Sequence, residues 1–132
     1  MSTNSTYTGG VTPGGPPQTR DLGELTLTKL AVDPEMSNNC YFLECRATGE
    51  VVLIDAAAEP ERLLQLLEDR TLTAIVTTHQ HWDHHRALAQ VKAAHPDAVV
   101  IAGEPDADAI TEQTGVAVDQ RVAHGDRVAV GT

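Results

Sequence analysis

The sequence predicts an α/β fold, because short β-rich runs alternate with helical patterns along the chain. Apolar and polar residues alternate over residues 22–32, as they do in a half-buried strand. Pro60 stands where the first residue of a helix belongs, and leucines repeat at helical spacing after it, so an amphipathic helix is expected over residues 59–70. The next run, residues 73–77, predicts a buried central strand.

The rest of the chain continues this alternation of strands and helices. The other expected elements are strands 40–45 and 51–55 joined as a hairpin by 46–50, a helix from His84 or His85 to His95, strand 97–101, a short helix 105–113 closed by Gly115, and two strands around Gly125 within 116–130. Residues 1–20 are mostly Ser, Thr, Gly and Pro, so we expect a disordered leader before one domain over residues 21–132.

Charge and composition exclude some classes of partner. The net charge is −10, with only nine Lys and Arg residues, which argues against nucleic acid and favours the capture of cations. No apolar run approaches the length that crosses a membrane, and no targeting segment is recognisable. Cys40 and Cys45 lie roughly 16 Å apart along one expected strand, on opposite faces. We therefore expect reduced, buried thiols and a cytoplasmic protein.

The residues most informative about function follow the expected central strand. Residues 78–85 read Thr-His-Gln-His-Trp-Asp-His-His. Side chains two apart on an extended chain point the same way, so His79 and His81 can bind one cation, while Asp83 and His84 can reach a second. Imidazole and carboxylate ligands without a thiolate suit zinc, with iron(II) or manganese as alternatives. The competing interpretation is a solvated loop that is merely rich in histidine.

The pattern His-x-His-x-Asp-His after a strand resembles the defining motif of the metallo-β-lactamase fold superfamily. The run Glu50-Val51-Val52-Leu53-Ile54-Asp55 is similar to the superfamily's strand that ends in an aspartate. The resemblance covers residues 22–132 and implies half of an αββα sandwich, a mixed sheet with flanking helices. Relatives complete their site with further histidines and an aspartate from the second half. After the motif this chain has only His85, His95 and His124, so we expect a fragment or a half-domain.

The resemblance implies a function in metal-assisted hydrolysis. In it, His79 and His81 hold the first metal, Asp83 and His84 hold the second, and Asp83 also takes part in catalysis by binding the attacking water. It further implies that Asp55 supports the motif from behind. We expect Trp82 to wall one side of the metal pocket, and His85 to support the site without binding metal or to lie at the surface.

The substrate and the partner stay open at this point. A thioesterase of the hydroxyacylglutathione hydrolase kind, a lactonase, a β-lactamase-like enzyme and an iron-dependent persulfide dioxygenase share this half of the fold, all with small-molecule substrates. The competing hypothesis is a non-catalytic half-domain that acts through association, as a homodimer or with a missing C-terminal half.

Overall fold

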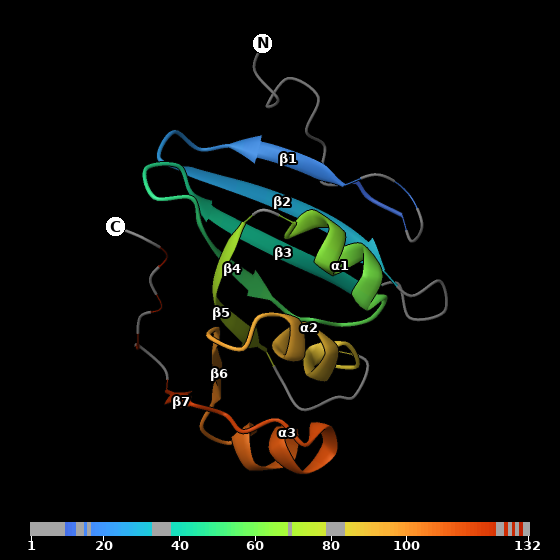
Figure 1. Cartoon of the computed structure of the whole chain (residues 1–132), viewed down its shortest axis with the longest axis vertical. Helices are drawn as coiled ribbons and strands as arrows, with labels where there is room; N and C mark the ends of the chain where they lie inside the picture. Colours follow the sequence, from blue (N-terminus) through green and yellow to red (C-terminus); the bar gives the residue numbers. More distant parts are fainter. Residues whose placement is uncertain are drawn as a thin grey trace.

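The protein forms one mixed β-sheet with helices packed against it, as a computed structural model shows (Figure 1). The structure describes residues 10–12, 15, 17–32, 38–68, 70–78, 84–123, 126, 128 and 130. Over these residues it contains seven strands and three helices. The expected α/β class is therefore confirmed.

The strands follow one another across the sheet in sequence order, from β1 to β7. In chain order the elements are β1 (Gln18–Asp21), β2 (Leu25–Val32), β3 (Asn38–Cys45), β4 (Glu50–Ile54), α1 (Pro60–Leu66), β5 (Thr71–Thr77), α2 (Leu88–Ala94), β6 (Val99–Gly103), α3 (Ala107–Thr114) and β7 (Gln120–Val122). Strands β1 to β4 pair antiparallel, and β4 to β7 pair parallel.

The helices lie on one face of the sheet (Figure 1). Parallel strands that follow in one direction need crossovers of a single hand, and these place every connecting helix on the same side. The main core confirms this arrangement, because buried residues of all three helices pack with the strand side chains of that face. Its helical members are Leu63, Leu88, Val91, Ala107 and Ile110.

The opposite face of the sheet is also apolar, but no residue of α1, α2 or α3 packs on it. Val52, Ala74 and Ile101 are buried there, and partly buried residues surround them, namely Leu43, Ile54, Val76, Val122 and Val130. This set is called the open face below. The molecule thus has the layer of strands and helices that half of an αββα sandwich implies.

The first strand corrects the expected boundary of the leader. Residues 18–20, which we expected to be disordered, belong to β1 and pair with β2. Leu22, which we expected inside a strand, lies between the two strands and is exposed. The cause is the next residue, Gly23, whose φ of 87° turns the chain in a conformation that glycine adopts without steric cost.

The helices also differ from their expected bounds. Helix α1 ends at Leu66 and not at Arg70, while α2 begins at Leu88 and not at His84 or His85. The residues before α2 form turns instead, in one of which the Leu88 N–H donates to the His85 carbonyl. Helix α3 begins at Ala107 and not at residue 105, and Gly115 closes it as expected, with a φ of 75°. Of the two strands expected around Gly125, β7 is found, and Gly125 itself lies outside the described residues.

Both cysteines are buried and form no disulfide, as the sequence predicts. Among the described residues, no helix is both long enough and apolar enough to cross a lipid bilayer.

Candidate metal centre

The candidate site lies where β4 and β5 end. These two strands are parallel neighbours, with Ile54 opposite Val76, so their carboxyl ends meet at one edge of the sheet. Asp55 follows β4 directly, and Thr78 follows β5. Edges of this kind are where α/β proteins build their sites. His79, His81, Trp82 and Asp83 fall on residues 79–83, which lie outside the described part of the chain. Their roles stay predictions.

Asp55 is buried and sits in an uncommon backbone conformation. Its φ is 61°, in the left-handed region that aspartate tolerates better than most residues, and its exposed fraction is 5%. Its backbone N–H donates to the Val76 carbonyl at 2.7 Å. This bond connects the end of β4 to β5, and the chain leaves the sheet at Asp55, whose carboxylate lies at this edge.

Three donors contact the Asp55 carboxylate. The Thr78 backbone N–H donates to Oδ1 at 2.8 Å, and the Thr78 hydroxyl donates to Oδ2 at 2.7 Å. Nδ1 of His84 lies 3.1 Å from the same Oδ2. Thr78 precedes residues 79–83 and His84 follows them. One buried carboxylate therefore holds the residues on both sides of the motif segment.

The backbone after Asp55 adds two further anchors. The N–H of Arg86 donates to the Ala57 carbonyl at 3.1 Å, and the N–H of Ala87 donates to the Ala56 carbonyl at 2.9 Å. These bonds connect the chain just before α2 to the segment that follows β4. They also show that the chain on each side of residues 79–83 is fastened to one short segment, residues 55–57.

The contact with Asp55 determines which nitrogen of His84 suits a metal. A carboxylate accepts a hydrogen bond, so of the two neutral tautomers the contact favours the one with its proton on Nδ1 and its lone pair on Nε2. Histidines that bind metals are commonly oriented by such a carboxylate. The described residues alone contain no group of three potential ligands. The expected donor set, His84 with the motif residues His79, His81 and Asp83, is nevertheless the imidazole and carboxylate chemistry that zinc and iron accept.

His85 is buried, with an exposed fraction of 3%, so a surface position for it is wrong. It lines a hollow of about 410 Å³ between the start of α2 and the end of α3, together with Arg86, Gln90, Gln113 and Thr114. Burial is compatible with the other expected role, support of the site, which stays a prediction. His95 follows the last residue of α2 and lies away from this site, at the other end of that helix.

The comparison with protein families decides the kinship of the chain. The model of the metallo-beta-lactamase superfamily matches residues 33–128, which include the anchoring segment and the whole motif. This chain belongs to the metallo-beta-lactamase superfamily. Among relatives, it is 34% identical over 106 residues to a hydroxyacylglutathione hydrolase-like protein of Bos taurus, covering 78% of this chain and 50% of that protein. It is 36% identical over 95 residues to the hydroxyacylglutathione hydrolase of Rhodospirillum rubrum, covering 71% and 35%. The chain thus spans half or less of these relatives' length.

Solved structures agree on the fold of this superfamily member. A metallo-beta-lactamase from Staphylococcus aureus superposes with a TM-score of 0.66 at 21% identity, covering 83% of this chain and 31% of that one. The protein TTHA1623, solved in a di-iron-bound form, superposes with a TM-score of 0.57 at 28% identity, covering 76% and 56%.

A buried thiol lies close to the anchoring segment of this superfamily member. Burial raises the pKa of Cys40 to about 12; hydrogen bonds from the backbone of Ala57 and Ala58 oppose the rise, and the charges of Asp55 and Glu59 add to it. Cys40 is thus a buried thiol that packs beside the anchoring segment.

Sequence reasoning did not single out Thr78, Ala56 or Ala57, although they fasten the chain on either side of residues 79–83. Their contribution comes from backbone groups and one hydroxyl, which no motif describes. One signal could have indicated the two alanines: the run of three alanines at residues 56–58, which is almost fully buried and leaves room for the chain before α2 to approach.

Proposed function

We propose that this chain carries the metal-binding part of a metal-dependent hydrolase. The observation that supports this most directly is the anchoring of the residues on both sides of 79–83. Asp55 binds Thr78 on one side and His84 on the other, with further backbone bonds from residues 56 and 57. A site that binds a metal needs its ligands fixed before the ion arrives, and support of this kind commonly sets metal affinity.

The motif residues divide between two metals in this proposal. His79 and His81 hold the first ion, and Asp83 and His84 hold the second. When bound, zinc or iron supplies a Lewis acid that activates water. Asp83 accepts a hydrogen bond from the attacking water, and Asp55 keeps the His84 lone pair on Nε2. We propose zinc as the metal, with two ions in a complete site. Iron is the second candidate, because TTHA1623 was solved in a di-iron-bound form. Manganese is the third.

A catalytic zinc takes three protein ligands, and the motif offers two to each metal. We therefore propose that a second copy or a further protein segment supplies the others, and that the 132-residue chain by itself is weakly active or inactive.

The substrate we propose is a thioester. The relatives named above carry the name hydroxyacylglutathione hydrolase, and glutathione is acylated through its sulfur.

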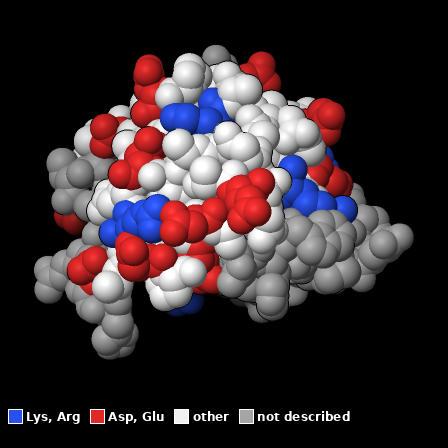
Figure 2. All heavy atoms as spheres, turned by 90° about the horizontal axis from the view of Figure 1, so that it is seen from below, with Lys and Arg blue, Asp and Glu red and all other residues white. Residues whose placement is uncertain are grey.

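A small-molecule substrate fits the charge of the protein better than nucleic acid does. The face of the molecule at the α3 end carries many acidic side chains, and its basic side chains lie beside them (Figure 2). Arg121, for example, is paired with Asp108 and Glu104. Because both cysteines are buried thiols that form no disulfide, we propose that the protein is cytoplasmic.

Metal analysis after dialysis, followed by a thioester assay of the loaded protein, tests this function. The unchanged chain is expected to retain zinc, and the double variant His79→Ala with His81→Ala is expected to lose it. His95→Ala is the matched control, since His95 lies at the far end of α2. Equal metal content in the unchanged chain and the double variant would refute the metal site. Metal retention without thioester hydrolysis, even with a relative's C-terminal part added, would refute the substrate.

A second candidate function is association without catalysis. The observation that favours it is the open face, whose partly buried apolar residues no helix covers in the described part of the chain. Apolar area of this kind commonly marks an interface. The occupant proposed is a second copy, packed sheet against sheet. Light scattering with and without zinc tests it: a dimer that Leu43→Lys dissociates supports association, and a monomer at all concentrations excludes it.

A further inference from the structure

Thr78 makes two of the three described contacts at the Asp55 carboxylate. Its backbone N–H binds Oδ1 and its hydroxyl binds Oδ2, so the two oxygens are held by one residue, at 2.8 and 2.7 Å. Two bonds to the two oxygens fix the plane of a carboxylate, whereas one bond leaves it able to rotate about its χ2 angle. Thr78 therefore sets the orientation of the Asp55 side chain.

The orientation matters because His84 uses one particular oxygen. Its Nδ1 lies 3.1 Å from Oδ2, the oxygen that also accepts the Thr78 hydroxyl. Without the hydroxyl, the Thr78 N–H still holds Oδ1, but of the described contacts Oδ2 keeps only the one with His84, so its position is less restrained. Loss of the Thr78 hydroxyl therefore affects His84 through Asp55, and this effect does not need a direct contact between Thr78 and His84.

The neighbouring threonine shows that this arrangement is specific. Thr77 is 1% exposed, yet among the described residues its hydroxyl has no hydrogen-bond partner. Adjacent positions at the end of β5 thus carry the same side chain in two opposite situations. Only the second hydroxyl reaches Asp55.

We propose that Thr78 is a positioning residue, whose hydroxyl locks the Asp55 carboxylate and thereby holds His84 with its proton on Nδ1 and its lone pair on Nε2. The link to metal binding rests on the function proposed above. The link to the His84 tautomer does not, because it follows from the three contacts alone.

The first test reads the imidazole in the metal-free protein. Long-range ¹H–¹⁵N spectra distinguish the two neutral tautomers of a histidine. His84 is expected in the Nδ1-protonated form in the unchanged chain. Thr78→Val keeps the shape and the backbone N–H but removes the hydroxyl, and it is expected to give a mixture with the Nε2-protonated form. Thr78→Ser is expected to restore the original tautomer, and Thr77→Val, the matched control, to leave it unchanged.

The second test measures zinc affinity by competition with a chromophoric chelator. Thr78→Val is expected to weaken binding by about 10- to 100-fold, the usual effect of removing a group that orients a ligand. Thr78→Ser and Thr77→Val are expected to bind nearly as the unchanged chain does. Circular dichroism of every variant identifies any that fail to fold; if Thr78→Val is one of them, Thr78→Ala, which also lacks the hydroxyl, takes its place in the comparison.

The outcomes separate this inference from the proposed function. If Thr78→Val changes neither the tautomer nor the affinity, or if Thr78→Ser is as impaired as Thr78→Val, the positioning role is overturned. If the unchanged chain binds no zinc while its tautomer responds to Thr78→Val, the positioning role stands and the metal function fails.

Discussion

At the scale of single residues, Asp55 connects the fold to the site. The sequence alone indicated that an aspartate ends β4, and the resemblance implied that it supports the motif. The left-handed conformation and the three donors could not be predicted, because they depend on how β4 and β5 align. Sequence patterns identify candidate ligands well, since the ligands are local. They do not identify the residues that orient them across the sheet.

Replacing Asp55 by alanine is expected to weaken zinc binding by about 10- to 100-fold, because His84 and Thr78 lose their common acceptor. Titration with a competing chelator measures the change. Asp97→Ala, at an exposed position after α2, is the control. If both variants bind zinc alike, Asp55 has no part in holding the site.

The Cys40 thiol is expected to make stability depend on pH in the alkaline range. Its pKa is raised from 9.0 to about 12 in the folded chain, so between these values the unfolded chain loses the proton first and unfolding becomes easier as pH rises. Below pH 9 this contribution is constant. Urea unfolding from pH 8 to 11 is expected to show a steeper loss of stability for the unchanged chain than for Cys40→Ala. Parallel curves would show that the Cys40 thiol does not cause the dependence.

At the scale of elements, most strands and helices were predictable, whereas β1 and several element ends were not. The strand Gln18–Asp21 contains no apolar residue, so no pattern marked it, and it exists because β2 offers it hydrogen-bond partners. The start of α2 was misplaced because residues 85–87 form turns, which Arg86 and Ala87 connect to the segment after β4. Both errors have one cause: contacts distant in sequence override local preference.

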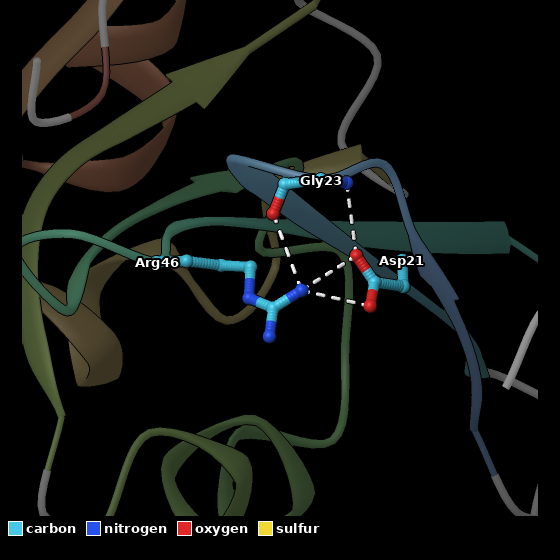
Figure 3. Close-up of polar contacts among 3 residues, drawn as sticks. All are labelled: Asp21, Gly23 and Arg46. Atoms are coloured by element: carbon cyan, nitrogen blue, oxygen red, sulfur yellow. Dashed lines mark hydrogen bonds and ion pairs between the residues drawn. The ribbon is translucent and has the colours of Figure 1, made fainter. Parts of the chain in front are cut away.

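The turn after β1 is fastened to the β3–β4 hairpin by Arg46 (Figure 3). Arg46 Nη1 lies 2.8 Å from both carboxylate oxygens of Asp21 and 3.2 Å from the Gly23 carbonyl, while the Gly23 N–H binds Asp21 Oδ1 at 2.9 Å. The Gly23 N–H first, and Arg46 second, hold the pKa of Asp21 below its usual value. Both side chains are exposed, so the effect on stability is small.

The sign of this effect can be tested with Asp21→Asn. A lowered folded pKa stabilises the protein above the unfolded value of 3.8, and the stabilisation is lost as pH falls below it. The unchanged chain is therefore expected to exceed Asp21→Asn in urea midpoint at neutral pH, and the difference is expected to shrink on acidification through pH 3.8. If the urea midpoints of the two proteins differ by the same amount at neutral pH and below pH 3.8, the charge of Asp21 is not the cause of the difference.

At the scale of the whole molecule, the two faces of the sheet are unequal. Leu53 points into the core under the helices and is fully buried, whereas Leu43 lies half-buried on the open face. Their side chains are chemically the same and belong to adjacent strands. This inequality was foreseeable from the resemblance, which implies one half of a sandwich. Which residues lie on each face required the register.

Truncation of the two leucines measures the inequality. Leu53→Ala is expected to cost about 2–5 kcal/mol of unfolding free energy, the usual range for a buried leucine. Leu43→Ala is expected to cost about 1 kcal/mol or less in a monomer, because much of its surface meets water in either state. Urea unfolding at two protein concentrations measures both. A large, concentration-dependent cost at Leu43 would show instead that a second copy covers the open face.

The sequential order of the strands affects how the chain folds as it is made. Every hydrogen-bonded neighbour of a strand in this sheet is also its neighbour along the chain. During synthesis, each strand after β1 therefore finds its pairing partner already synthesised. No pairing has to be delayed until a strand much later in the sequence has been translated. Domains assemble from the N-terminus at the pace of translation. A nascent chain that ends after β4 is accordingly expected to resist protease over β1 to β4, before the metal motif has been synthesised.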